Sequence, residues 1–184
     1  MKTFKNIPIF PLKSIILPGG QFPLRIFERR YLDMTRECLK NDKGFVIALT
    51  KRDSDYISSV YDYASYVEIV DWSQLDGGLL GITVEGKNIV KLNNYALDES
   101  NLLKGDASEI ECGVDYLVPQ KYQILSKFYK KIYPEIKAYI FHIKPKYNDA
   151  NWLGYRLIEC LPLELDDKAD LISMQEPLDR LERI

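Results

Sequence analysis

The chain has 184 residues, with 25 Lys and Arg against 27 Asp and Glu, so its formal net charge is −2. Its 46% hydrophobic and 28% charged residues are typical of a globular protein, and they exclude a disordered chain and a strongly basic nucleic-acid-binding arm. No apolar run approaches the roughly 18 residues that a membrane span needs. The polar start of the chain argues against a secretory signal. Three widely spaced cysteines form neither a disulfide framework nor a zinc motif, which indicates a reducing, cytoplasmic location.

Residues 1–118 contain short apolar runs separated by glycine and proline, a pattern typical of β-strands. We expect strands over residues 7–12, 21–26, 45–50, 61–69, 79–84, 88–92 and 107–111. Pro8 and Pro11 cannot donate hydrogen bonds to a neighbouring strand, so the first strand should lie at an edge or contain a bulge. The turn chemistry of Glu85-Gly86-Lys87 predicts a hairpin between the runs on either side of it.

One helix is expected among these strands. Tyr31, Met34 and Cys38 recur at helical spacing, which predicts an amphipathic helix from about Arg29 to Lys40. Asn41-Asp42-Lys43-Gly44 should end it, with Gly44 available for the left-handed cap. Six or seven strands around one helix, with many proline and glycine breaks, predict a strongly bent sheet or a partly closed barrel.

Residues 119–184 have the periodicity of helices. Ile124, Phe128 and Ile132 lie at i, i+4 and i+8, which predicts a buried stripe, and Pro134 is typical of the first position of a new helix. That stripe would continue through residues 139–143. The chain is therefore expected to have an α+β fold, with a β-rich subdomain over 1–118 and a helical bundle over 119–184.

Three further helices are predicted from their first residues. Asn148 or Asp149 can cap a helix that carries Trp152, and Asp166-Asp167 suits the start of a short helix because acidic groups are favoured at the positive end of the helix dipole. Pro177 should begin the last helix.

The helical half has an uneven charge distribution. Residues 121–146 contain seven lysines and one acidic residue, whereas residues 147–184 contain four basic and nine acidic residues. A basic helix packed near acidic helices accounts for this pattern. The alternative, a surface for nucleic acid or an anionic membrane, is disfavoured because the basic segment has no arginine.

Residues that could perform catalysis are scarce. Residues 81–88 nearly spell a phosphate-binding loop, but Asn88 replaces the hydroxyl that would hold magnesium, and the flanking residues favour strands rather than a helix. His142 is the only histidine, and its lysine-rich surroundings favour a surface position. We therefore expect no catalytic residue, no cofactor and no metal.

Several segments together resemble the N-terminal domain of the Lon protease family, especially its short stand-alone members. The segments are Ile7–Leu12, Leu17–Gly20, Pro23–Glu28, Arg30–Met34, Val67–Asp71, Gly78–Gly86, Arg156–Leu163 and Arg180–Arg183. They occur in the same order along nearly the whole chain.

The resemblance implies a bent, PUA-like pseudo-barrel followed by a helical bundle. In the full-length protease this region is understood to engage substrate proteins, and the ATPase and peptidase domains come after it. The chain stops where those domains would begin, so we expect neither activity. We expect a monomeric, non-enzymatic module whose partners are unfolded or partly unfolded proteins and peptides, with no membrane or nucleic-acid partner. A PUA-like RNA-binding module is the alternative, on fold analogy alone, and the net charge of −3 over residues 1–119 argues against it.

The loop over residues 17–23 suggests where peptides would bind, because it puts apolar side chains on a turn, where burial is hard to complete. The candidate residues are Pro18, Phe22, Leu24, Arg25, Phe27, Arg30, Tyr66 and Trp72. Three alternatives stay open at this point. Phe22 and Leu24 could instead pack in the core, the two arginines could form surface ion pairs with Glu28 or Asp33, and Tyr61, Tyr63 and Tyr66 could be core aromatics.

Overall fold

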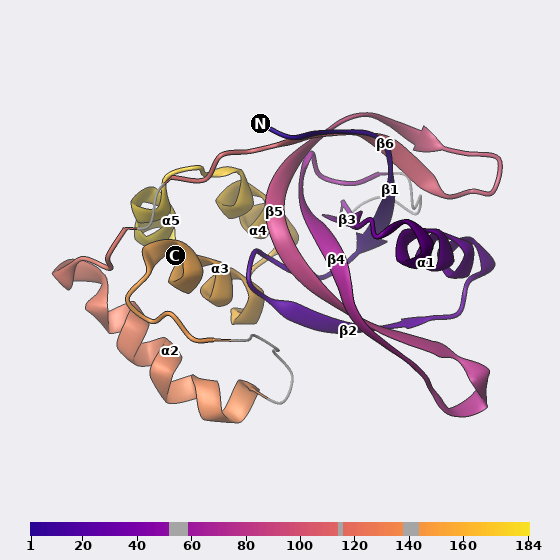
Figure 1. The fold of residues 1–184 in the computed structure, drawn as a ribbon. Helices are drawn as coiled ribbons and strands as arrows, with labels where there is room; N and C mark the ends of the chain where they lie inside the picture. The colour runs from indigo at the N-terminus through magenta and orange to yellow at the C-terminus, as the bar shows by residue number, and fades with distance from the viewer. Residues whose placement is uncertain (52–58, 114–115, 138–143) are drawn as a thin grey trace.

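A computed structural model describes residues 1–51, 59–113, 116–137 and 144–184, and it shows a strongly curved sheet beside a group of helices (Figure 1). The strands are β1 (Thr3–Leu12), β2 (Gln21–Ile26), β3 (Phe45–Leu49), β4 (Tyr63–Gln74), β5 (Leu80–Leu97) and β6 (Leu103–Glu109). The helices are α1 (Arg29–Asn41), α2 (Gln123–Ile136), α3 (Ala150–Cys160), α4 (Leu165–Ser173) and α5 (Pro177–Arg183), with 3-10 turns η1 (Asp76–Gly78) and η2 (Gln120–Tyr122).

This arrangement confirms the predicted α+β fold, with one helix among the strands and the other helices after them. The described strands end at Glu109 and the later helices start at η2, while a subdomain boundary at residue 118 stays a prediction. His142 and the stripe over residues 139–143 lie outside the described residues. No helix in the described ranges is both long and apolar enough to cross a bilayer.

The sheet closes on itself through β5. The strand order is β2-β5-β4-β3-β1-β6, and β5 also pairs with β6, so five strands form a ring to which β2 is added. Only the β1–β3 pairing is parallel among the pairs of named strands. β1 lies between β3 and β6, with a register shift between Phe4 and Ile7, so it is a bulged strand and not an edge strand.

The predicted hairpin at Glu85-Gly86-Lys87 is wrong, because β5 runs as one strand from Leu80 to Leu97. Gly86 serves a close backbone approach instead of a turn. Its N–H donates to the Gly20 carbonyl oxygen at 2.9 Å, and its own carbonyl accepts from the Gly19 N–H at 2.9 Å. A Cβ at Gly86 would lie 2.4 Å from the Leu17 carbonyl oxygen. The glycine therefore lets the 17–20 loop cross β5, and the segment that resembles a phosphate-binding loop is extended strand.

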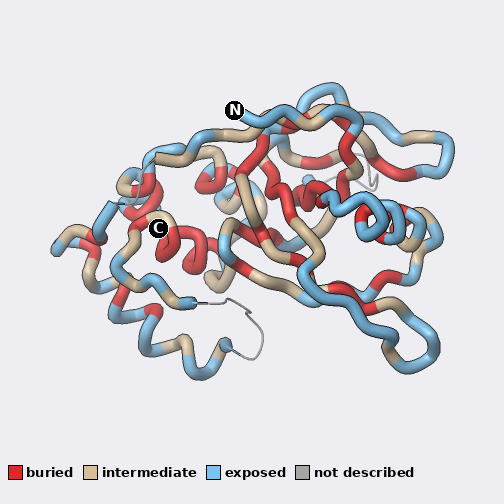
Figure 2. Tube along the Cα trace, in the orientation of Figure 1, coloured by how far each residue is buried: buried red, intermediate tan, exposed pale blue. Residues whose placement is uncertain are grey.

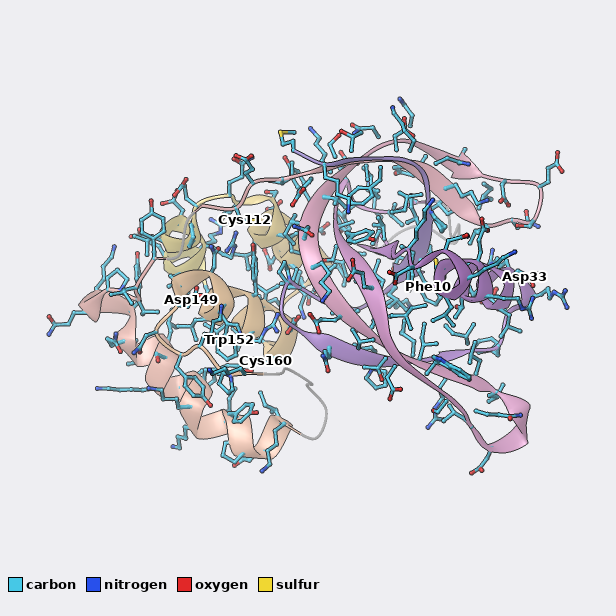
Figure 3. The ribbon with its side chains drawn as sticks, viewed as in Figure 1. Phe10, Asp33, Cys112, Asp149, Trp152 and Cys160 are labelled. Carbon is cyan, nitrogen blue, oxygen red and sulfur yellow. The ribbon has the colours of Figure 1, made fainter. Side chains whose placement is uncertain are left out.

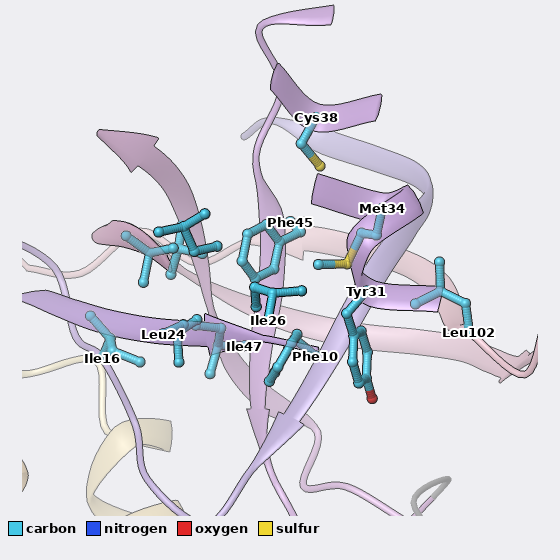
Figure 4. Packing of buried hydrophobic residues seen from close by; sticks show 13 residues of the cluster. Phe10, Ile16, Leu24, Ile26, Tyr31, Met34, Cys38, Phe45, Ile47 and Leu102 are labelled. Atoms are coloured by element: carbon cyan, nitrogen blue, oxygen red, sulfur yellow. The ribbon is translucent and has the colours of Figure 1, made fainter. Parts of the chain in front are cut away.

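The helix α1 packs its predicted face into the core of the curved sheet. Tyr31, Met34 and Cys38 are buried against Phe10 and Phe45 (Figure 4), and the Phe10 and Tyr31 ring centroids are 4.2 Å apart. The burial of these three side chains confirms the prediction made from their helical spacing.

The cap of α1 differs from the prediction. Asp42 adopts the left-handed conformation, with φ of 50°, and Gly44 has another role. A Cβ at Gly44 would lie 2.0 Å from the Val67 carbonyl oxygen, so this glycine lets the loop pass close to β4.

The predicted buried stripe on α2 is also wrong. Ile124 is 72% exposed and Phe128 is 42% exposed, whereas Tyr129 is fully buried. Tyr129 packs edge-on against Trp152 of α3, with 5.5 Å between the ring centroids. Two apolar series overlap along this helix, and the one that includes the large Tyr129 ring faces α3. Pro134 lies inside α2 near its end and does not start a new helix.

The last three helices begin as predicted. The side chain of Asp149 accepts a hydrogen bond from the Trp152 N–H at 3.0 Å and so caps α3. The helix α4 carries Asp166 and Asp167 in its first turn, and Pro177 is the first residue of α5. The side-chain cap of α3, the acidic first turn of α4 and the proline at the start of α5 thus agree with the predicted helix starts.

Neighbouring residues on α2 should respond differently to truncation. Tyr129→Ala should lower the free energy of unfolding by about 3–5 kcal/mol, because it empties a fully buried site. Phe128→Ala should change it by about 1 kcal/mol or less, because that ring is partly in solvent. Denaturant unfolding of both variants checks this, and equal losses would show that α2 is rotated relative to this structure.

The turn between β5 and β6 should make stability depend on acid pH. A hydrogen bond from the Ser100 hydroxyl, with further help from Lys104 and the Leu102 and Ser100 N–H groups, holds the pKa of Asp98 below its ordinary 3.8. A depressed folded-state pKa contributes stability that is complete above the unfolded value and is lost as pH falls below it. Asp98→Asn should therefore be less stable than the parent at neutral pH, and the gap should shrink below about pH 4. Thermal unfolding across pH measures the gap, and a gap that stays constant would contradict the prediction.

Candidate functional site

The junction between the sheet and the helices is built around a buried ion pair on α3. Arg156 is fully buried, and its Nε lies 3.0 Å from the Oε2 of Glu159. Its Nη2 donates to the carbonyl oxygens of Leu17 and Pro18, each at 3.1 Å. The Leu17 N–H donates to Oε1 of Glu159 at 2.7 Å. One turn of α3 therefore donates hydrogen bonds to the 17–20 loop through Arg156 and accepts one from it through Glu159.

The same pair leaves no room for a side chain at Gly20. A Cβ there would lie 2.7 Å from Glu159 Oε1 and 2.8 Å from Arg156 Nη1. Burial raises the pKa of the Glu159 carboxyl, while the Arg156 guanidinium and the Leu17 N–H act in the opposite direction by stabilising the carboxylate. The pair is thus a buried structural joint in which Nη2 makes the hydrogen bonds of the guanidinium, while Nε and Nη1 are buried with no hydrogen-bond partner among the described residues.

A second buried arginine ties the helices to one another. Arg180 of α5 is fully buried, and its Nη1 donates to Asn151 Oδ1 at 3.0 Å, while its Nε donates to the Leu171 carbonyl at 3.3 Å. It also donates to the Met174 carbonyl. Its guanidinium lies 4.5 Å from the centroid of the Tyr155 ring. Arg180 therefore connects α3, α4 and α5.

Two of the predicted peptide-binding residues are core residues. Leu24 is buried with Ile26 among the side chains inside the curved sheet. Tyr66 is buried, stacks on Phe4 at 4.5 Å between centroids, and accepts a hydrogen bond from the Gly44 N–H at 3.0 Å. Both predictions are corrected, because each side chain packs in a buried cluster: Leu24 in the cluster that includes α1, and Tyr66 in a second cluster with Val46 and Ala64. The core alternative is the right one for them.

Phe27 and Trp72 are both exposed. Phe27 follows β2 directly and is 70% exposed, and Trp72 on β4 is 62% exposed. Both lie in the part of the sheet formed by β2, β5 and β4: Trp72 and Leu24 pair with Ile82 from its two sides, and Phe27 follows Ile26, which pairs with Leu80. Together with the exposed Val70 and Leu79, Phe27 and Trp72 form what we call the hairpin surface, which we define as the exposed apolar side chains of the β4–β5 hairpin and of the end of β2 (Figures 1 and 2).

The remaining predicted residues do not join this surface as a group. Arg25 is exposed on β2 and pairs with Gly81 of β5, which pairs on its other side with Ser73 of β4. Phe22 is half-buried and packs on the core. Arg30 pairs with Glu28 at 2.6 Å and donates to the Asn101 carbonyl at 2.7 Å, so the ion-pair interpretation holds for it.

Pro18 lies in a different place, at the joint itself. It helps to line a hollow of about 320 Å³ together with Gly19, Asn151, Trp152, Tyr155 and nearby residues. A second hollow of about 490 Å³, with Leu117 and Lys130 in its lining, adjoins it, since Lys146 and Asp149 line both. Asp149 and Trp152 lie at the start of α3 (Figure 3).

Sequence reasoning missed the buried pair on α3. A signal for it was present, since Arg156 and Glu159 stand three residues apart in a helix whose other residues are mostly apolar. Two opposite charges at that spacing on an apolar helix indicate a buried, paired site. The hollows gave no such local signal because their lining comes from distant segments. In the described parts of the chain, no group of three or more His, Cys, Asp or Glu side chains is placed to hold a metal ion.

Comparison with known proteins matches this architecture to one family. The family profile described as the ATP-dependent protease La (LON) substrate-binding domain matches residues 6–184. The chain belongs to the Lon substrate-binding domain family. The resemblance predicted from the sequence segments is therefore confirmed.

Relatives and solved structures agree with this assignment. The chain is 24% identical to Lon protease 3 of Sorangium cellulosum and 21% identical to the Lon protease of Haemophilus influenzae, over 97% and 98% of its own length. It spans only 22% and 23% of those two proteins. The crystal structure of a Lon N-terminal domain protein from Xanthomonas campestris matches the whole chain and 96% of its own, with a TM-score of 0.81 and 27% identity. The N-terminal domain of Lon protease from the Mycobacterium avium complex shares the fold, with a TM-score of 0.63 over 98% of this chain and 95% of its own, at 16% identity.

Breaking the buried pair from one side should be costly. Arg156→Met should lower the free energy of unfolding by about 3–5 kcal/mol, because Glu159 would keep a buried charge without a counter-charge. Arg156→Met combined with Glu159→Leu should recover much of that loss. The control is Arg29→Met, which breaks an exposed pair with Asp33 and should cost about 1 kcal/mol or less. A loss no larger than the control's, measured by denaturant unfolding, would rule out the joint as described.

Proposed function

We propose that this Lon-type substrate-binding domain binds exposed hydrophobic segments of unfolded or partly unfolded proteins, and that it does so through the hairpin surface. The family match over residues 6–184 carries the substrate-binding part of the proposal. The exposure of Trp72 on the β4–β5 hairpin and of Phe27 directly after β2 supports the choice of surface. Large apolar side chains that gather in solvent often mark an interaction site.

The size of this surface suggests weak and sequence-tolerant binding. Phe27 and Trp72 are each more than half exposed, so covering either would remove on the order of 100 Å² of mostly apolar area from water, worth roughly 3 kcal/mol. Part of that gain is lost to the ordering of the bound segment. Because the driving force is removal of apolar area from water, affinity should change little with salt.

The domain itself is proposed to have no ATPase or peptidase activity. The matched profile is that of a substrate-binding domain, and residues 81–88 are strand, with Asn88 at the magnesium-ligand position. RNA binding, the alternative from fold analogy, has no support in the comparisons, and the net charge of −3 over residues 1–119 counts against it.

Polar substitutions on the hairpin surface should weaken binding to an unfolded protein. Phe27→Ser combined with Trp72→Ser should reduce affinity for labelled, reduced and alkylated α-lactalbumin by about tenfold or more, equivalent to about 1.4 kcal/mol. Both side chains are exposed, so the variant should keep its stability.

The matched control is Ile124→Ser on α2, since Ile124 is as exposed as Phe27 but lies in the helical part. It should bind like the parent, and raising salt from about 50 to about 500 mM should change the parent affinity by about twofold at most. Parent-like binding by the double variant, or an equal loss in the control, would refute the hairpin surface as the binding site.

A further inference from the structure

The two hollows at the joint share part of their lining, and none of their described lining residues belongs to the hairpin surface. We call them together the junction groove, because they share Lys146 and Asp149. Its lining comes from four separate parts of the chain, and the residues used below are Pro18, Leu117, Lys130, Lys144, Lys146 and Trp152. The groove thus runs from the 17–20 loop of the sheet part across the start of α3 to α2.

The groove has an excess of positive charge. Lys130, Lys144 and Lys146 line it, and among the described residues of the lining Asp149 is the single acidic one. That carboxylate is already engaged as the cap of α3, where it accepts from the Trp152 N–H at 3.0 Å. Within the described ranges, none of the three lysines forms an ion pair, although the Nζ of Lys130 lies 5.1 Å from the centroid of the Tyr147 ring. An occupant that brings carboxylates would complement these charges.

The rest of the lining is apolar or aromatic. Pro18 and Trp152 form part of one hollow, and the exposed Leu117 borders the other. The 17–20 loop comes close to Trp152, since a Cβ at Gly19 would lie 3.9 Å from the Cδ1 atom of that ring. Lysines around an apolar lining suit a segment that carries both acidic and apolar side chains. A polyanion without apolar groups would interact with the lysines and leave the apolar part of the lining without a partner.

We propose that the junction groove binds extended acidic segments of substrate proteins, with carboxylates beside Lys144 and Lys146 and apolar side chains against Pro18 and Trp152. The proposal rests on the proposed function and names a class of substrate segment within it. It also separates two modes of binding. Binding at the hairpin surface should not depend on salt, whereas binding in the groove should weaken as salt increases, because exposed charges are screened.

The chain offers a built-in reporter for the groove. It contains two tryptophans, Trp72 and Trp152, so Trp72→Phe leaves Trp152 as the single tryptophan. In that background, a peptide alternating Glu with Leu should change the Trp152 fluorescence as it binds. The same peptide with Gln in place of Glu should bind about tenfold more weakly at low salt, and the difference should narrow at high salt.

The variants test whether the lysines of the groove are responsible. Lys144→Gln combined with Lys146→Gln should reduce affinity for the Glu peptide about tenfold and leave the Gln peptide unaffected. The matched control is Lys127→Gln combined with Lys131→Gln, which removes the same charge from exposed positions on α2 outside the groove lining, and it should reduce affinity by about twofold at most. All four lysines are exposed, and the melting temperatures of both variants should match the parent.

Three outcomes would overturn the proposal. Equal losses in the two lysine variants would show a diffuse charge effect, and tighter binding of a single-stranded RNA of equal charge than of the Glu peptide would assign the groove to polyanions. If the Trp152 fluorescence did not respond to the Glu peptide while alkylated α-lactalbumin still bound the hairpin surface, the junction groove would be ruled out as a binding site and the proposed function would be unaffected. If α-lactalbumin also failed to bind, the proposed function would fall independently.

Discussion

The structure depends on the burial of one cation, that of Arg156, between the helices and the sheet. A buried charge is costly unless a counter-charge and hydrogen-bond acceptors lie beside it. Here these are the Glu159 carboxylate and the carbonyls of Leu17 and Pro18. The requirement fixes the 17–20 loop against α3. The loop in turn crosses β5 at Gly86. The buried pair on α3 therefore fixes the point at which this loop contacts β5.

Features that depend on neighbouring residues in the chain could be predicted from the sequence. Asp149 and Pro177 carry the chemistry of helix starts, and the spacing of Tyr31, Met34 and Cys38 identifies the buried face of α1. The family assignment also followed from sequence segments, because their order along the chain reflects the order of the elements.

Features that depend on distant contacts could not be predicted. Glu85-Gly86-Lys87 has the composition of a turn, and only the approach of the 17–20 loop shows why glycine is needed in a continuous strand. On α2, two apolar series compete, and the position of Trp152 on another helix decides between them. In each case the local pattern fits two structures, and tertiary packing selects one.

The candidate sites show the same limit. Phe27 and Trp72 could be named from the sequence, but Leu24 and Tyr66 could not be separated from them without the tertiary packing that buries those two side chains. Val70 and Leu79 join the hairpin surface because the structure leaves them exposed. The lysines of the junction groove were visible as an unusual charge cluster, but their position beside Pro18 is a property of the fold.

The closed ring of strands has a consequence for synthesis of the chain on the ribosome. β1 pairs with β6, which lies roughly 90 residues further along the chain. At about 5–20 residues per second, one edge of β1 would remain open for about 5–20 s before β6 emerges. Because they are three residues apart, Pro8 and Pro11 remove one backbone donor from each edge of β1, and the bulge after Phe4 interrupts its register with β6. The features that make β1 an irregular strand thereby protect the nascent chain from pairing with the wrong strand.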